Sequence, residues 1–284
     1  MSEFIVALPA AVLYLFSAFR QWQTIRGDRP ANRNLVLTLA MLAALTHLGF
    51  LLYGAVTSDS AHPGINFAFY NIGWVITLLL LFSSLKKPVE NLFVGLFPMI
   101  AVLLVVSSFS QQRETLDHLS YGLVWHILLS ILAYSVFVIA AVQSVLLSLQ
   151  DHHLRKHKTH GLIQALPPLQ TMDLLLIEMI WLGMILLTLA FAIGWPSVVD
   201  LKEQHLLHKV VFASIGWAVF AMLLFGRYRF GWRGVTASRW TLIGTGFLVL
   251  SYRQIATPDR CIPQCICQAM PQHQYHQYHS RMTG

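Results

Sequence analysis

The sequence predicts an all-α integral membrane protein, a bundle of about eight transmembrane helices. Three observations predict it. Apolar residues make up 56% of the 284-residue chain. Charged residues make up only 11%, against about 25% in an ordinary soluble domain. None of the basic residues lies in the middle of a long apolar run. So few charges indicate a chain that folds in a solvent other than water.

Eight apolar runs are the candidate helices, because about 20 residues at about 1.5 Å each cross a hydrocarbon core of about 30 Å. The runs cover residues 4–20, 35–56, 65–85, 89–108, 120–149, 172–195, 206–226 and 240–252. The first is short and contains Pro9, the fifth is long enough to extend into water, and the eighth has only 13 residues before Arg253. We expect residues 1–252 to form a single membrane domain and residues 253–284 to form a polar tail.

The positions of the basic residues indicate how the chain lies in the membrane. Thirteen of the 19 Lys and Arg residues lie in or beside four alternate connections, and only three lie in the others. Cytoplasmic connections are enriched in Lys and Arg. We therefore predict that the N-terminus faces outward and that the loops at 20–34, 86–88, 150–171 and 227–239 face the cytoplasm. The net charge of +7 then reflects topology, and we expect no binding of nucleic acid.

Histidines inside the apolar runs are candidate functional residues, because an ionisable group in a bilayer needs a polar partner. His47 shares a helix face with Ala40, Ala43, Ala44 and Gly54. Small residues at these positions predict close packing against another helix. Both an interhelical hydrogen bond and a role as a ligand or proton carrier are compatible with this position.

Three further polar positions lie near the ends of apolar runs. His126 lies near the outer end of the fifth run, with Ser130 one turn away on the same face, and is either a structural hydrogen-bonding group or a ligand. His205 and His208 share a face at the start of the seventh run, where they form either a solvated helix end or a metal or haem-iron site. Glu178 in the sixth run either pairs with a polar neighbour or relays protons.

Two more groups of metal-ligand residues lie outside the apolar runs. One group lies in the connection after the fifth run and consists of His152, His153, His157 and His160. The other lies in the polar tail and consists of Cys261, Cys265, Cys267, His273, His276 and His279. The cysteine spacing fits neither a zinc ribbon nor a haem-attachment motif. Solvated surface is the simpler reading of the first group, and a disordered or frame-altered end without function is the simpler reading of the tail. Metal binding is the alternative for both.

Four segments carry a resemblance to a known family. They are residues 123–134 (LVWHILLSILAY), 167–169 (PPL), 208–217 (HKVVFASIGW) and 226–234 (GRYRFGWRG). Their order resembles that of the CcsA-like cytochrome c assembly proteins, a family of haem-handling membrane proteins. It is most similar to the short branch typified by the bacterial inner-membrane proteins YpjD and HemX. The resemblance covers residues 1–252.

The resemblance implies a site for non-covalently held haem b on the outer side of a bacterial inner membrane. His126 occupies the position of an outer haem ligand in the family's signature helix. We expect His208 to be the opposite ligand of the haem iron, because the seventh run starts at the same boundary, and His47 to be the reserve. Ser130 is expected to orient the imidazole of His126. The implied partners are haem, the lipid bilayer, and other cytochrome c assembly proteins or apocytochrome c.

The sequence departs from the family where haem attachment would occur. Residues 196–207 stand in place of a tryptophan-rich loop and contain no tryptophan, and Phe225 stands where a family histidine is expected. We therefore predict a protein that binds or presents haem without covalent chemistry of its own, and not an enzyme. The alternatives are a HemX-like membrane regulator of tetrapyrrole synthesis and a small transporter that uses His47, Glu178 and His126 as a polar path.

The charge distribution makes a direct prediction about topology. Reporter fusions at Arg33, Lys158 and Arg233 should all give cytoplasmic signals, because each position lies in a connection rich in basic residues. Fusions that are active only outside the cytoplasm, paired with fusions that are active only inside it, measure this. An outward signal at any of the three positions contradicts the prediction.

Overall fold

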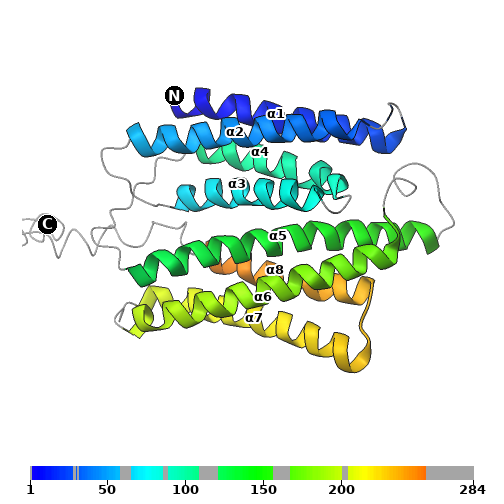
Figure 1. Cartoon of the computed structure of the whole chain (residues 1–284). Coiled ribbons are helices and arrows are strands. Elements are labelled where there is room, and N and C mark those ends of the chain that lie inside the picture. Colours follow the sequence, from blue (N-terminus) through cyan, green and yellow to red (C-terminus); the bar gives the residue numbers. More distant parts are fainter. Residues whose placement is uncertain are drawn as a thin grey trace, which may run out of the picture.

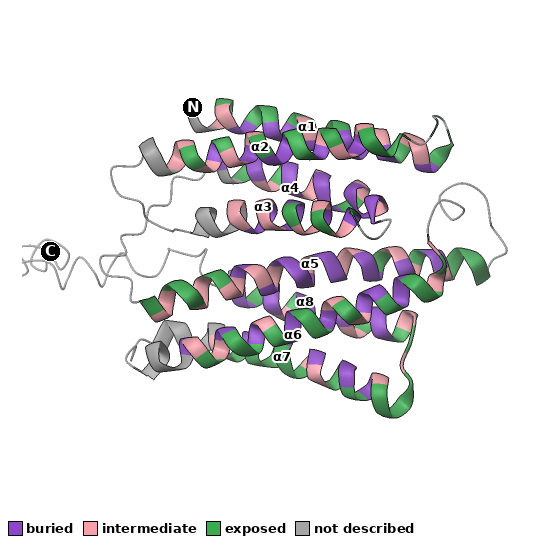
Figure 2. Ribbon diagram, in the orientation of Figure 1, coloured by how far each residue is buried: buried purple, intermediate pink, exposed green. Residues whose placement is uncertain are grey.

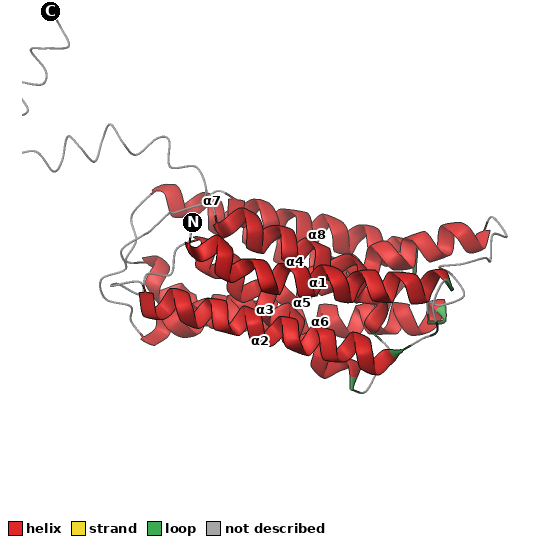
Figure 3. Ribbon diagram, turned by 90° about the horizontal axis from the view of Figure 1, so that it is seen from above, coloured by secondary structure: helices red, strands yellow, loops and turns green. Residues whose placement is uncertain are grey.

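Helices make up nearly all of the structure, a computed structural model (Figures 1 and 3). The structure describes residues 2–27, 30, 32–57, 65–85, 89–108, 121–155, 167–199 and 204–253. Within these ranges, the side chains of residues 2–3, 55–57, 65–69, 107, 195–199, 204–209 and 252–253 are outside the description. The described residues contain helices and no strand, which confirms the predicted all-α class.

The eight α-helices follow the eight predicted runs. They are α1 (Ser2–Arg26), α2 (Arg33–Thr57), α3 (Ile65–Ser84), α4 (Phe93–Ser108), α5 (Tyr121–Arg155), α6 (Leu169–Val199), α7 (Gln204–Phe230) and α8 (Val235–Arg253). A short 3-10 helix, η1 (Glu90–Leu92), precedes α4. In the described part of the chain, five helices (α1, α2, α5, α6 and α7) are long and apolar enough to cross a membrane. Together these features confirm a helical membrane bundle.

The first and last helices are longer than the sequence predicted. α8 begins at Val235 and not at residue 240, so it has 19 residues and a length of about 28 Å. Its first turn is closed by the hydrogen bond from the Ser238 N–H to the Gly234 carbonyl. α1 continues to Arg26 and contains Pro9 within the helix. The hydropathy pattern placed the predicted ends of both helices next to a charged residue. A helix can continue past such a residue where it reaches the membrane surface, because a long charged side chain can extend to water there.

The helices form two groups of four, α1–α4 and α5–α8, and α5 is the helix of the second group that faces the first. α1–α4 lie on one side of α5 and α6–α8 lie on the other (Figure 1). α5 contributes Ile131 and Ile139 to the first hydrophobic core and Ala133, Phe137 and Ala140 to the second. The buried positions accordingly face inward along α5 (Figure 2). We call the end of the bundle that carries the α1–α2, α3–α4, α5–α6 and α7–α8 connections the basic end.

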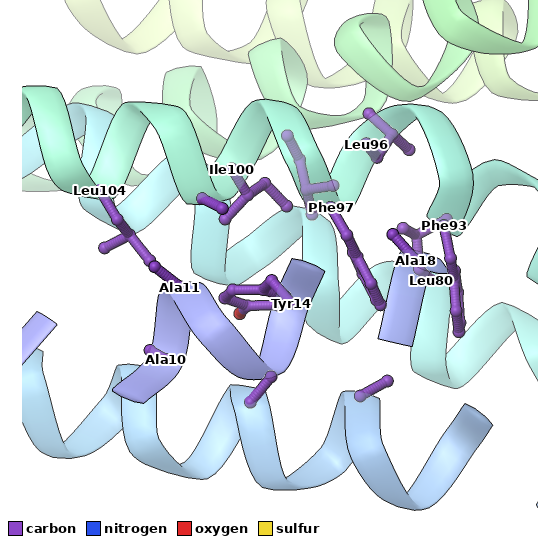
Figure 4. Close-up of a cluster of buried hydrophobic side chains, with 14 of the residues drawn as sticks. Ala10, Ala11, Tyr14, Ala18, Leu80, Phe93, Leu96, Phe97, Ile100 and Leu104 are labelled. Carbon is purple, nitrogen blue, oxygen red and sulfur yellow. The ribbon is translucent and has the colours of Figure 1, made fainter. Parts of the chain in front are cut away.

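The first core depends on the close approach of α1 to α4. Ala10, Ala11 and Ala18 are buried on the face of α1 that carries Tyr14 (Figure 4). Small side chains let two helices approach closely in a membrane. Tyr14 fills the centre of this contact, where its ring packs edge-on against Phe97 of α4 with centroids 5.1 Å apart.

The second core contains an aromatic pair held between two glycines. Phe137 of α5 and Phe220 of α7 stack with ring centroids 4.1 Å apart. A Cβ at Gly183 of α6 would lie 2.8 Å from the Phe137 ring, and a Cβ at Gly244 of α8 would lie 2.9 Å from the Phe220 ring. Four helices therefore meet in one layer, and the two glycines provide the space for it.

A buried ion pair closes the basic end of the second group. Asp173 near the start of α6 pairs with Arg227 in the last turn of α7 at 2.7 Å. Arg227 also donates to the carbonyl of Trp232, and Asp173 accepts the N–H of Gly234. These bonds tie the α7–α8 connection to α6.

The glycines of the segment 226–234 have structural causes at this end. Gly231 and Gly234 have φ angles of +68° and +59°, in the left-handed region that favours glycine. A Cβ at Gly226 would lie 2.3 Å from the indole of Trp232, which stacks on Trp240 with centroids 5.4 Å apart. The segment 226–234, which carries part of the family resemblance, is therefore a tight turn that packs against the helices on either side of it.

The glycine against Phe220 can be tested within one helix. Gly244→Val should lower the free energy of unfolding by about 1–3 kcal/mol, because extra atoms in a packed core force side chains and backbone apart. Gly246→Val is the matched control, since a Cβ there meets nothing within 4 Å. Thermal unfolding in detergent measures both, and equal midpoints for the two variants would contradict the packing described here.

Candidate functional site

His126 lies in the second turn of α5, about 7.5 Å along the helix from Tyr121, at the end of the bundle opposite the basic end. Its side chain is half-buried. Its Nδ1 lies 2.7 Å from the carbonyl oxygen of Ala190 in α6. This hydrogen bond joins the two helices and fixes the direction of the imidazole.

Gly194 makes room for the imidazole on α6. It follows Ala190 by one helical turn, so the two residues lie on the same face. A Cβ at position 194 would lie 2.4 Å from Nδ1 and 2.8 Å from Cε1 of His126. Only glycine allows the ring to lie against the α6 backbone at this point.

The hydrogen bond also defines the tautomer of His126. A carbonyl oxygen only accepts, so Nδ1 must be the donor, and in the neutral imidazole Nε2 then carries the lone pair. Histidines that bind metals use this arrangement, in which the second ring nitrogen donates to a carbonyl or carboxylate. The sequence suggested Ser130 as the orienting group, but the Ala190 carbonyl occupies that place at Nδ1.

An exposed apolar stripe runs along α5 beside His126. It consists of Tyr121, Val124, Trp125 and Leu128, at the spacing of one helix face, and Trp125 is 59% exposed. His126 therefore lies at the border between the α5–α6 contact and an apolar surface. Such a surface suits either lipid chains or a flat apolar ligand.

For His208, the other predicted ligand, the structure describes the helix position but not the side chain. His208 is in the second turn of α7, and His205 is in the first, but the side chains of both are outside the described residues. α7 begins at the same end of the bundle at which α5 begins. The pairing of His208 with His126 stays a prediction.

His47 is fully buried in the first group of helices, where it ends a chain of hydrogen bonds. Thr77 donates to the carbonyl of Gly73 one turn earlier in α3, at 3.0 Å. The hydroxyls of Tyr14 and Thr77 are 2.9 Å apart, and Tyr14 Oη lies 3.0 Å from His47 Nδ1. The chain thus joins α1, α2 and α3, which confirms the predicted interhelical hydrogen bond of His47.

The order of donors in this chain follows from counting protons. Thr77 has one hydroxyl proton and gives it to the Gly73 carbonyl, so it accepts from Tyr14. Tyr14 then accepts from the Nδ1–H of His47, and Nε2 is the unprotonated nitrogen. Among the described residues, this buried Nε2 has no hydrogen-bond partner. The role of His47 as a reserve ligand stays a prediction.

The remaining candidate residues do not come together in the described structure. Glu178 is exposed on α6, whereas His47 is fully buried among α1–α3, so the two line no common internal path. His152 and His153 are exposed near the end of α5, and the rest of the histidine and cysteine clusters lies outside the described residues. Where the chain is described, no three His, Cys, Asp or Glu side chains are placed to hold a metal ion.

Several residues of these sites were missed from the sequence. Ala190 acts through its backbone carbonyl, which carries no side-chain signature. Tyr14 and Thr77 are uncharged and occur in apolar runs, where they resemble ordinary core residues. Asp173, at the basic end, does carry a sequence signal, because an acidic residue beside an apolar run needs a cationic partner.

Known proteins resemble this chain over about half to most of its length. The family described as "Cytochrome C assembly protein" matches residues 5–255. "Inner membrane protein YpjD" of Escherichia coli (strain K12) is 26% identical over 225 residues, which are 78% of this chain and 84% of that protein. "Protein HemX" of Brevibacillus brevis is 28% identical over 138 residues, which are 48% of this chain and 50% of that protein. No solved structure matches the chain.

The buried hydrogen-bond chain predicts a cost for removing its central hydroxyl. Tyr14→Phe should lower the free energy of unfolding by about 1–3 kcal/mol, because buried donors and acceptors lose their partner. Tyr228→Phe is the control, since Tyr228 is 93% exposed. The double variant Tyr14→Phe, His47→Leu should lose less than the sum of the single changes, as measured by chemical unfolding. Strict additivity would contradict the chain described here.

Proposed function

The chain belongs to the cytochrome c assembly protein family, and we propose that it binds haem b non-covalently and presents it at the outer side of the inner membrane. Family membership and the similarity to YpjD and HemX support a haem-related role in the membrane. The N-terminus is proposed to face outward, from the distribution of basic residues. His126 then lies in the outer half of the membrane.

The single observation that carries the proposal is the geometry of His126. Its Nδ1–H is held by the Ala190 carbonyl, so Nε2 of the neutral ring is the atom available to a metal. Gly194 and the α6 backbone hold the ring in place before any ligand arrives. A ligand whose direction is already set loses little freedom on binding.

The surroundings of His126 fit a haem. The apolar stripe of Tyr121, Val124, Trp125 and Leu128 can cover a macrocycle, and the nearby end of the bundle lets propionates reach water. The iron would supply the bond to Nε2 of His126. His208 is the proposed opposite ligand, and His47 the reserve, which lies about 15 Å along α2 from Thr57.

The proposed activity is presentation of haem without covalent chemistry. Residues 196–207, between the sixth and seventh apolar runs, contain no tryptophan, so the stacking platform expected of a haem-attaching relative is missing from this segment. The proposed recipients are other cytochrome c assembly proteins or apocytochrome c.

A second candidate function follows from the similarity to HemX. A membrane regulator of tetrapyrrole synthesis would act through a partner protein at the basic end. It would not need a haem ligand at His126. The absorption spectrum of the purified protein separates the two functions.

Substitution of His126 tests the proposal. The protein purified in mild detergent after expression with ample haem should show a Soret band, and His126→Gly should lower it. Added imidazole should restore part of the absorbance, because it can occupy the space of the missing ring. Gly194→Val should also lower the band, since its Cβ would displace the imidazole.

The control is His153→Gly, because His153 is exposed near the end of α5 at the basic end. A Soret band unchanged in His126→Gly would rule out ligation by His126. A wild-type protein without a Soret band would overturn the haem proposal and favour the regulatory function.

A further inference from the structure

An open apolar groove lies on the outside of the first helix group, where α1 passes α4 near the basic end. Its volume is about 370 Å³, and it is lined by Leu15, Ala18, Phe19, Trp22, Val94 and Pro98. Its lining is almost entirely apolar. The groove lies on the first helix group, whereas His126 lies on the second, so the groove takes no part in the proposed haem site.

The groove has a narrow floor and large apolar walls. Ala18 is 4% exposed and forms the floor, while Leu15 and Phe19 on α1 are about half-exposed. Val94 and Pro98 supply the opposite wall from α4 and lie one turn apart. Pro98 has no N–H to donate to the carbonyl of Val94, so the helix backbone is less fully bonded at this wall.

A cation lies at the end of the groove nearest the basic end. The guanidinium of Arg26 stands 5.7 Å from the centre of the Trp22 ring. Arg26 is exposed and one turn beyond Trp22, so it can bind an anion while the indole holds its position. Arg20, nearly two turns before the end of α1, donates to Gln23 in the same region.

We propose that this groove binds one anionic phospholipid, with an acyl chain along Phe19 and Val94 and the phosphate against Arg26. Basic residues at the membrane surface attract anionic headgroups. Tryptophan at the end of the groove suits the level of the headgroups.

The size of the wall residues distinguishes lipid from a partner helix. Helix–helix contacts in membranes use small residues. The small residues of α1 are buried inside the bundle, and Ala18 is the one that also reaches the groove, at its floor. The groove instead presents Leu15, Phe19 and Trp22, which give a flexible chain a wide apolar surface. A bound lipid bridges α1 and α4 and therefore stabilises their contact.

Lipid binding by the full-length protein in detergent tests the proposal. Native mass spectrometry with equal amounts of phosphatidylglycerol and phosphatidylcholine should show preferential retention of one phosphatidylglycerol. Arg26→Gln should lower that preference about fivefold, because each basic residue near an anionic surface contributes about 1 kcal/mol of binding free energy. Trp22→Ala should lower retention of both lipids. Arg229→Gln is the control, since Arg229 is an exposed arginine at the basic end of the other helix group.

Three results would overturn the proposal. One is equal retention of the two lipids by the wild-type protein. Another is an equal loss of preference in Arg26→Gln and Arg229→Gln, which would mean that the whole basic surface attracts the lipid. The third is a dimer that disappears in Trp22→Ala, which would assign the groove to a second copy of the chain.

Discussion

The lack of polar partners in lipid is the constraint on which the rest of the structure depends. A polar side chain inside the bundle must find its partner within the protein. Thr77, Thr188 and Thr241 donate to the backbone carbonyl one turn earlier in their own helices. Where charge is buried, the partner is a charge: Asp173 lies against Arg227 at the basic end. The threonine bonds satisfy each hydroxyl within its own helix. Bonds between elements, such as the Asp173–Arg227 pair, also fix how neighbouring helices lie against each other.

Glycine packed against an aromatic or imidazole ring is the second recurring feature of the structure. Without a Cβ, the glycine lets the ring and the neighbouring helix lie close together. Gly183 and Gly244 make room for the stacked Phe137 and Phe220, and Gly226 makes room for Trp232. In these places the ring locks helices together. Gly194 does the same for the imidazole of His126, so the proposed ligand is held by a device that the fold uses elsewhere for structure alone.

Composition and charge placement were enough to predict the helices, because the bilayer permits few other folds for such a chain. The end of a helix was harder to predict. Hydropathy stopped α8 at residue 240, although the turn at Gly234 starts it at Val235. The site was predicted only in part, because side chains have sequence signatures and backbone carbonyls do not. His126 was identifiable, whereas its partner Ala190 was not.

His47 and His126 show why the same residue type in the same bundle supports two different roles. In both, Nδ1 is the donor and Nε2 carries the lone pair. His47 is fully buried between α1, α2 and α3, and its bond to Tyr14 continues through Thr77 into the backbone of α3. A large ligand could reach its Nε2 only if three packed helices separated. His126 is half-buried at the end of the bundle beside an exposed apolar stripe, and its ring direction is set by α6 alone. Access, and not the chemistry of the imidazole, is therefore what separates the two histidines: the proposed ligand position at His126 is open at the bundle end, whereas His47 lies within packed helices.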